Sequence, residues 1–142
     1  MKKLPVRELL LCCGLLLCGY TYGGIAMIGH ANLPRLDEGT VQKLYTGKLI
    51  ELGGINIVAV NAPSGSLIRT RFLRVFLNQD EDKYTAYWTV RRHIGKGNPP
   101  HELASSTEVI NFVQATPGAI GYVDETDLKP GLSVLARKTD AK

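Results

Sequence analysis

The chain passes from an apolar strand into a helix at Val60-Asn61-Ala62-Pro63-Ser64-Gly65-Ser66. The residues that lead into this segment, Ile55 to Val60, are nearly all β-branched or small and apolar, which is typical of a buried strand. A helix is expected over Ser66 to Asn78, because its apolar residues follow a 3.6-residue period: Ile68, Phe72, Val75 and Phe76. The turn leaves backbone N–H groups unpaired at the positive end of the helix dipole, which suits an oxyanion.

Three residues of this turn are therefore candidate ligands for an anion. Ser64 and Ser66 carry hydroxyl donors, and Gly65 permits close approach of the backbone. The alternative is an ordinary capped helix start, with Ser64 or Ser66 as the N-cap residue. Both interpretations remain open at this level.

Arg69 is the fourth candidate, because it falls inside the apolar arc of the expected helix. A guanidinium rarely points into a core without a partner. Two arrangements are compatible with the sequence: Arg69 folds back to the helix start and completes an anion site, or it pairs with a structural carboxylate such as Asp124 or Glu125. Arg71 and Arg74 lie on the polar face and are expected to be solvated.

The first residues have the pattern of a secretory signal. Lys2, Lys3 and Arg7 form a basic start, an apolar run follows over Leu9 to Cys18, and small residues come next. The run has about half of the roughly 20 residues that a membrane span needs. We therefore expect a signal peptide over residues 1–23, a domain over residues 24–142 and a periplasmic location, with cleavage after Ala26 as the alternative to cleavage after Gly23. Lipid attachment at Cys18 is an alternative.

Composition restricts the function of the mature chain. All three cysteines lie in the signal, so thiol and disulfide chemistry are excluded after processing. Residues 1–23 also carry two of the four net positive charges, which leaves too small a basic excess for a nucleic-acid binder. His30 and His101 lack metal-ligand spacing, and no catalytic motif is present. We expect no enzyme, no metal and no cofactor.

The remaining segments predict an α/β layer fold in the order β-α-β-α-α-α-β-β. Beyond the segment already described, the expected elements are a strand at Ile25 to Ile28, a helix opened by Asp37, a helix opened by Asp80 or Asp82, a helix with a Ser105–Glu108 capping box, and strands at Ala119 to Val123 and Leu132 to Leu135. Residues 136–142 are expected to form a polar end.

Two basic residues have a second interpretation. Arg91 lies on the same arc as Tyr84, Tyr87 and Trp88, where a stacked guanidinium is either a structural contact or part of a docking surface. Lys96 lies in a Gly/Pro loop and is either solvated or helps to hold an anion. Trp88 and Tyr122 are most simply core residues.

Four stretches together resemble short, secreted phosphate-binding-protein-like chains, which are related to the substrate-binding component of the phosphate ABC transporter. These stretches are Leu44-Tyr45-Thr46-Gly47-Lys48, Gly65-Ser66 with Arg69 and Phe72, Tyr84 to Pro100, and Pro117 to Val123. The resemblance implies a single lobe of a type II periplasmic-binding-protein-like fold, with a central mixed β-sheet flanked by helices. It departs from full-length phosphate binders at Asn61, where they carry an Arg.

This resemblance implies a binding protein for phosphate or a similar oxyanion, connected with phosphate ABC transport. The expected ligands are Ser64, Gly65, Ser66 and Arg69. The alternative function is a periplasmic interaction or sensory adaptor with a vestigial anion site. Expected partners are an ABC permease, another periplasmic protein or a second copy of the chain, because the lobe that would close over the ligand has no counterpart among these residues.

Overall fold

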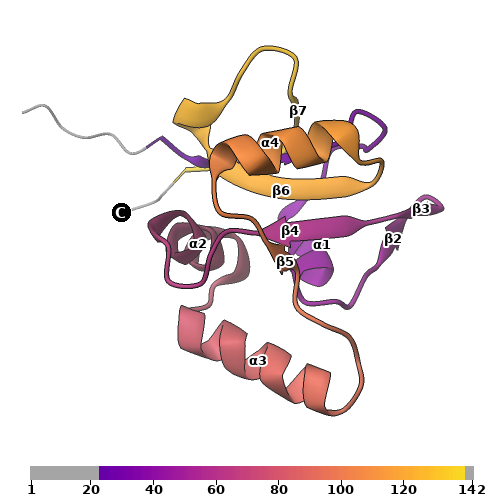
Figure 1. The fold of residues 1–142 in the computed structure, drawn as a ribbon, viewed down its shortest axis with the longest axis vertical. Helices are drawn as coiled ribbons and strands as arrows, with labels where there is room; N and C mark the ends of the chain where they lie inside the picture. The colour runs from indigo at the N-terminus through magenta and orange to yellow at the C-terminus, as the bar shows by residue number, and fades with distance from the viewer. Residues whose placement is uncertain (1–22, 140–142) are drawn as a thin grey trace, which may run out of the picture.

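A computed structural model describes residues 23–139. The expected signal peptide, its cleavage position and Cys18 lie outside the described residues, apart from Gly23 at their edge. The central sheet has five strands in the order β5-β4-β6-β1-β7. Their bounds are His101–Glu102 (β5), Val58–Asn61 (β4), Ala119–Asp124 (β6), Ile25–Gly29 (β1) and Ser133–Lys138 (β7). Figure 1 shows this sheet running across the molecule between the helices.

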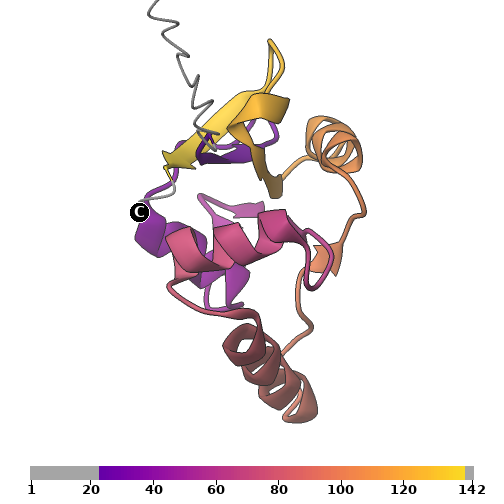
Figure 2. The same ribbon diagram turned by 90° about the vertical axis from the view of Figure 1, so that its left-hand side faces the viewer.

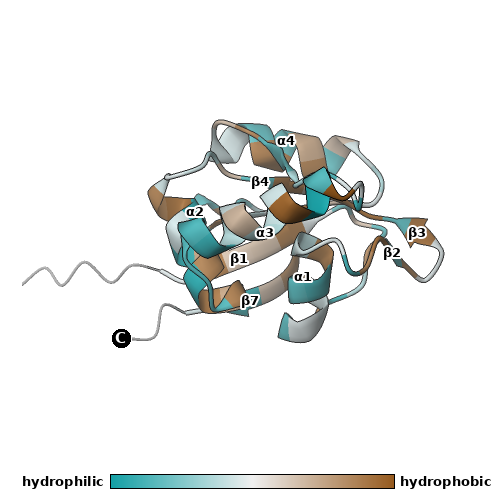
Figure 3. Cartoon of the chain, turned by 90° about the horizontal axis from the view of Figure 1, so that it is seen from below, coloured by the Kyte–Doolittle hydropathy of each residue, from teal (hydrophilic) through white to brown (hydrophobic). Residues whose placement is uncertain are grey.

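Strand directions make the sheet mixed. β4 runs parallel to both β5 and β6, whereas β1 is antiparallel to β6 and β7. All five residues of β1 are buried, which explains why Ile25 to Ile28 reads as an uninterrupted apolar run. In Figure 3, β1 has the colour of apolar residues and lies behind helices that carry both apolar and polar residues.

The helices follow the expected order along the chain. They are α1 (Glu38–Tyr45), α2 (Leu67–Phe72), the π-helical continuation η1 (Leu73–Leu77), α3 (Glu81–His93), α4 (Ser106–Ala115) and the short 3-10 helix η2 (Glu125–Asp127). Asp37 caps α1, Asp80 caps α3, and Ser105 caps α4. Ser105 accepts from the Glu108 N–H at 3.2 Å as the predicted capping box requires, but the Glu108 side chain accepts from the Ala104 N–H at 2.8 Å and not from that of Ser105.

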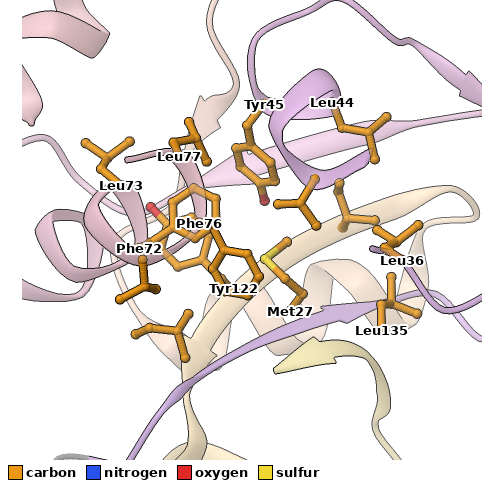
Figure 4. Close-up of a cluster of buried hydrophobic side chains, with 14 of the residues drawn as sticks. Met27, Leu36, Leu44, Tyr45, Phe72, Leu73, Phe76, Leu77, Tyr122 and Leu135 are labelled. Atoms are coloured by element: carbon orange, nitrogen blue, oxygen red, sulfur yellow. The ribbon is translucent and has the colours of Figure 1, made fainter. Parts of the chain in front are cut away.

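Two apolar clusters cover the two faces of the sheet. The larger one joins Met27 of β1 to α1, α2, η1 and α3, and its centre is aromatic. The Phe72 and Tyr122 rings stack with centroids 3.8 Å apart, and Tyr45 packs on Phe72 at 4.7 Å (Figure 4). The second cluster packs α4 against the opposite face through Val109 and neighbouring aliphatic residues.

Three sequence predictions need correction. The expected strand over Ile55 to Val60 is divided: β3 (Ile55–Asn56) pairs with β2 (Glu51–Leu52) in a small hairpin, and β4 begins at Val58, which is 41% exposed. The last strand ends at Lys138 and not at Leu135, because its final residues pair with β1. β5 was not expected, and it forms because His101–Glu102 pairs with the end of β4.

Candidate functional site

The turn between β4 and α2 has the geometry that its small residues suggested. Gly65 has a φ of +79°, a conformation that L side chains rarely adopt. Ser66 occupies the N-cap position, but its hydroxyl donates to the Pro63 carbonyl at 2.6 Å and makes no capping bond to α2. The first turn of α2 therefore begins without a side-chain cap.

Arg69 is buried beneath this turn, with 7% of its surface exposed. Its guanidinium donates to Glu81 through Nε at 2.9 Å and Nη2 at 2.7 Å, and Nη1 lies 3.0 Å from Glu102. Nη1 also reaches the Ala62 carbonyl at 3.3 Å. Of the two arrangements open from the sequence, the structure shows the pairing with carboxylates. The partners are Glu81 and Glu102 in place of the suggested Asp124 or Glu125.

Ser64 binds the same two carboxylates. Its backbone N–H donates to Glu102 at 2.6 Å, and its hydroxyl donates to Glu81 at 2.5 Å. Ser64 and Arg69 thus converge on one place, and carboxylate oxygens of the chain occupy it. One guanidinium faces two carboxylates there, so this cluster carries a net charge of −1.

A pocket of about 200 Å³ adjoins this cluster. Its lining comes from the turn, from α3 and from the segment leading into β5: Ser64, Arg69, Tyr84, Thr85, Trp88, Thr89, Arg92, Pro99, Pro100 and Glu102. Ser66 instead lines a second pocket of about 310 Å³, with Leu67, Ser105 and Ser106 at the starts of α2 and α4. The structure therefore brings Ser64 and Arg69 together and places Ser66 on the other side of the turn.

Asn61, the last residue of β4, is buried inside a polar network. It accepts from the Tyr122 hydroxyl and donates to the Tyr84 hydroxyl at 3.3 Å. Burial raises the pKa of Tyr84 to about 12 and raises that of Tyr122 as well. These phenols stay protonated and act as structural hydrogen-bond groups that hold the end of β4.

The prediction that Arg71 is solvated is wrong. Arg71 is buried against β6, where Nη1 donates to Asp124 at 2.5 Å and Nη2 to the Gly23 carbonyl at 2.5 Å. Burial opposes ionisation of Asp124, but hydrogen bonds from Arg71 and Thr126 outweigh it and lower the pKa of that carboxyl. The α2 helix therefore carries buried arginines on two sides, whereas Arg74 is exposed as expected.

Other candidate residues have structural surroundings. The Arg91 guanidinium lies over the rings of Tyr87 and Trp88, 5.5 and 5.7 Å from their centroids, as expected for a stacked contact. Lys96 is exposed in its loop. Within residues 23–139, no group of three or more His, Cys, Asp or Glu side chains could hold a metal ion. None of the helices in the same range has the length and apolar character that crossing a bilayer requires.

Comparison with known proteins identifies the fold through solved structures. No family model matches the sequence, and no curated protein matches it. An ABC-type phosphate transport receptor from Vibrio cholerae matches 79% of the chain at 14% identity with a TM-score of 0.60. PstS from Borrelia burgdorferi matches 82% at 19% identity and a TM-score of 0.60. A protein assigned as a phosphate ABC transporter substrate-binding protein from Clostridium perfringens, solved with bound phosphate, matches 81% at 24% identity and a TM-score of 0.57.

The chain thus has the α/β fold found in part of these phosphate receptors, with a central mixed sheet flanked by helices, as the sequence resemblance predicted. It spans 45%, 47% and 45% of the three solved chains, which is less than half of each. These likenesses, all below 25% sequence identity, establish the architecture alone.

Proposed function

We propose that this chain is a secreted periplasmic binding module without catalytic activity, which recognises phosphate or a related oxyanion in connection with phosphate ABC transport. One observation carries the proposal. Ser64 and Arg69 direct an N–H group, a hydroxyl and a guanidinium at carboxylate oxygens over distances of 2.5 to 3.0 Å. A carboxylate and a phosphate accept hydrogen bonds from the same donors, so these donors are already arranged around an oxyanion.

The carboxylate that phosphate would replace is Glu102. Its side chain is 49% exposed on the two-residue strand β5, whereas the Glu81 side chain is 24% exposed and accepts from both Arg69 and Ser64. Removal of Glu102 would leave the Ser64 N–H and one N–H of Arg69 Nη1 for a ligand, while Nη1 keeps its bond to the Ala62 carbonyl. Because hydrogen bonds to a charged group contribute roughly 1.5 to 3 kcal/mol each, competition from Glu102 weakens binding by at least about tenfold.

Isothermal titration of residues 24–142 with inorganic phosphate at low salt tests this function, with sulfate as the comparison anion. We expect weak binding to the parent chain and at least about tenfold tighter binding to Glu102→Gln, because the glutamine removes the competing charge. Arg69→Ala should abolish the heat of binding. Arg74→Ala, which removes an exposed cation from the same helical segment, is the matched control and should bind like the parent.

Two results would refute the assignment of this site. One is phosphate binding to Arg69→Ala at the affinity of the parent chain. The other is a Glu102→Gln variant that is folded by circular dichroism and gains no affinity for phosphate. Equal affinities for phosphate and sulfate would support an oxyanion site but would refute specificity for phosphate.

A second function is favoured by the charge of the same cluster. Arg69 is already neutralised by Glu81 and Glu102, so the fold needs no ligand to satisfy it. This favours a periplasmic interaction or sensory adaptor with a vestigial anion site, whose partner is a permease, another periplasmic protein or a second copy. Titrations without heat up to millimolar phosphate, for parent and Glu102→Gln alike, would support this function over the first.

A further inference from the structure

Positive charge is concentrated in one segment of the chain. Residues 83–101 contain Lys83, Arg91, Arg92 and Lys96 and no Asp or Glu. The rest of the range 23–139 has nine Lys and Arg against eleven Asp and Glu, which is a net charge of −2. The segment comprises most of α3 and the loop that leads into β5. Asp80, Glu81 and Asp82 directly precede this segment and Glu102 follows it, so the basic region is the last turn of α3 and its loop, with Arg91, Arg92 and Lys96.

Helix α3 uses only a narrow stripe of its surface to pack. Its buried residues are Tyr84 and Trp88, and the helix extends along one end of the molecule (Figures 1 and 2). Val90 and Ile94, one turn apart, are 60% and 57% exposed. Arg92 is also exposed. Residues two apart on a helix point to nearly opposite sides, so Val90 faces away from Arg92, which lies with Trp88 and Thr89 at the pocket.

A concave surface joins this helix to the edge of the sheet. The pocket of about 200 Å³ has Arg92, Trp88 and Thr89 of α3 on one side and Pro99 and Pro100 on the other. Beyond Pro100 comes β5, the last strand at one edge of the five-stranded sheet. The Leu103 N–H donates to Asn61 of β4, so the neighbouring backbone groups of Glu102 point to the outer edge.

We propose that this surface, made of the C-terminal half of α3, residues 95–100 and the outer edge of β5, binds an extended acidic segment of a partner protein. We call it the α3–β5 groove. Carboxylates of the partner fit Arg92 and Lys96, an apolar side chain fits the pocket against Trp88 and the prolines, and the backbone of the segment can pair with the free edge of β5. The groove includes the pocket that adjoins Ser64, Arg69 and Glu102, so a segment bound there would lie beside the proposed phosphate site.

Two features favour a peptide over an anionic membrane surface. The groove is concave and includes a strand edge, which a flat layer of headgroups does not complement. The aromatic side chains that anchor proteins at membrane interfaces also point inward here: Trp88 is buried, and the Tyr87 hydroxyl donates to the Thr46 carbonyl at 2.7 Å. Glu102 is the acidic residue of the pocket lining and pairs with Arg69, which also binds Glu81, and Arg92 is the second cation of that lining.

Fluorescence anisotropy with a defined probe tests the groove in the full mature chain. The probe is a labelled nine-residue peptide of alternating glutamate and valine, and the reference peptide has lysine at every glutamate position. We expect only the acidic peptide to bind, with affinity falling at least about tenfold in Arg92→Glu, because a charge-assisted hydrogen bond becomes a repulsion. Lys129→Glu makes the same change of charge at an exposed site in the η2–β7 loop and should bind like the parent.

A second variant separates the pocket from the charge. Thr89→Tyr fills the pocket without altering any charge, and it should weaken the acidic probe severalfold while circular dichroism shows an unchanged fold. Equal losses in Arg92→Glu and Lys129→Glu would overturn the proposal, since they would mean unspecific attraction. Absence of binding at millimolar probe, or binding of the chain to vesicles of phosphatidylglycerol in place of the acidic peptide, would overturn it as well.

Discussion

Arg71 and Asp124 form a buried ion pair whose stability depends on pH. The folded state lowers the pKa of Asp124, so the pair contributes fully above the unfolded-state pKa near 3.9 and is lost as pH falls through the lower folded-state value. Asp124→Asn leaves a buried guanidinium without its carboxylate and should lower the free energy of unfolding at pH 7 by roughly 2 to 4 kcal/mol. Urea midpoints measured from pH 7 to pH 3 should then decline less in the variant than in the parent.

The matched control is Asp82→Asn, which removes an exposed carboxylate from the first turn of α3. Its urea midpoint at pH 7 should stay within about 0.5 kcal/mol of the parent in free energy. If Asp124→Asn is as stable as Asp82→Asn at pH 7, the ion pair with Arg71 does not stabilise the fold.

Single residues also show where sequence reasoning about the site succeeds and where it fails. The helical period places Arg69 in the apolar arc, and burial of that side chain is confirmed. Its partners carry no local signal, because Glu81 and Glu102 are 12 and 33 residues away along the chain. The prediction that Arg71 is solvated fails because a helical wheel assumes one buried face, whereas Asp124 of β6 and Gly23 cover a second side of α2.

At the scale of elements, helices were predictable and short strands were not. Local chemistry defines three helix starts, because Asp37, Asp80 and Ser105 cap as their sequences indicate, whereas Ser66 makes no capping bond to α2. A two-residue strand such as β5 has no pattern of its own, because it exists only through pairing with β4. Strands β2 and β3 also have only two residues each, and they exist by pairing with one another across the Gly53-Gly54 turn.

The turn between α4 and β6 depends on one glycine. Gly118 has a φ of +78°, and a Cβ there would lie 2.0 Å from the carbonyl oxygen of Asn56 in β3. Gly118→Ala should therefore lower the free energy of unfolding by roughly 2 to 4 kcal/mol through strain and collision. Gly131→Ala is the control, because its φ is +88° but no atom lies within 4 Å, so strain alone should cost about 1 kcal/mol. Urea unfolding compares the two, and equal losses would exclude the collision with β3.

At the scale of the whole molecule, the last strand, β7, forms one edge of the sheet by pairing with the first strand, β1. β7 pairs with β1 as far as Lys138, whereas the sequence suggested that the strand ends at Leu135. A chain ending at Leu135 would lose three residue pairs and the Lys138–Glu38 ion pair, and would leave part of β1 as an unpaired edge. We expect its free energy of unfolding to be roughly 2 to 4 kcal/mol below that of a chain ending at Thr139, at about 1 kcal/mol for each backbone hydrogen bond lost.

Fluorescence of Trp88, the single tryptophan and a buried one, reports this unfolding in urea. Lys138→Ala in the chain that ends at Thr139 separates the contributions, since it removes only a half-exposed ion pair and should cost less than about 1 kcal/mol. The truncated chain should also aggregate more readily, because β1 is apolar throughout and its free edge can pair with another copy. Equal urea midpoints for chains ending at Leu135 and Thr139 would mean that the last residues of β7 do not stabilise β1.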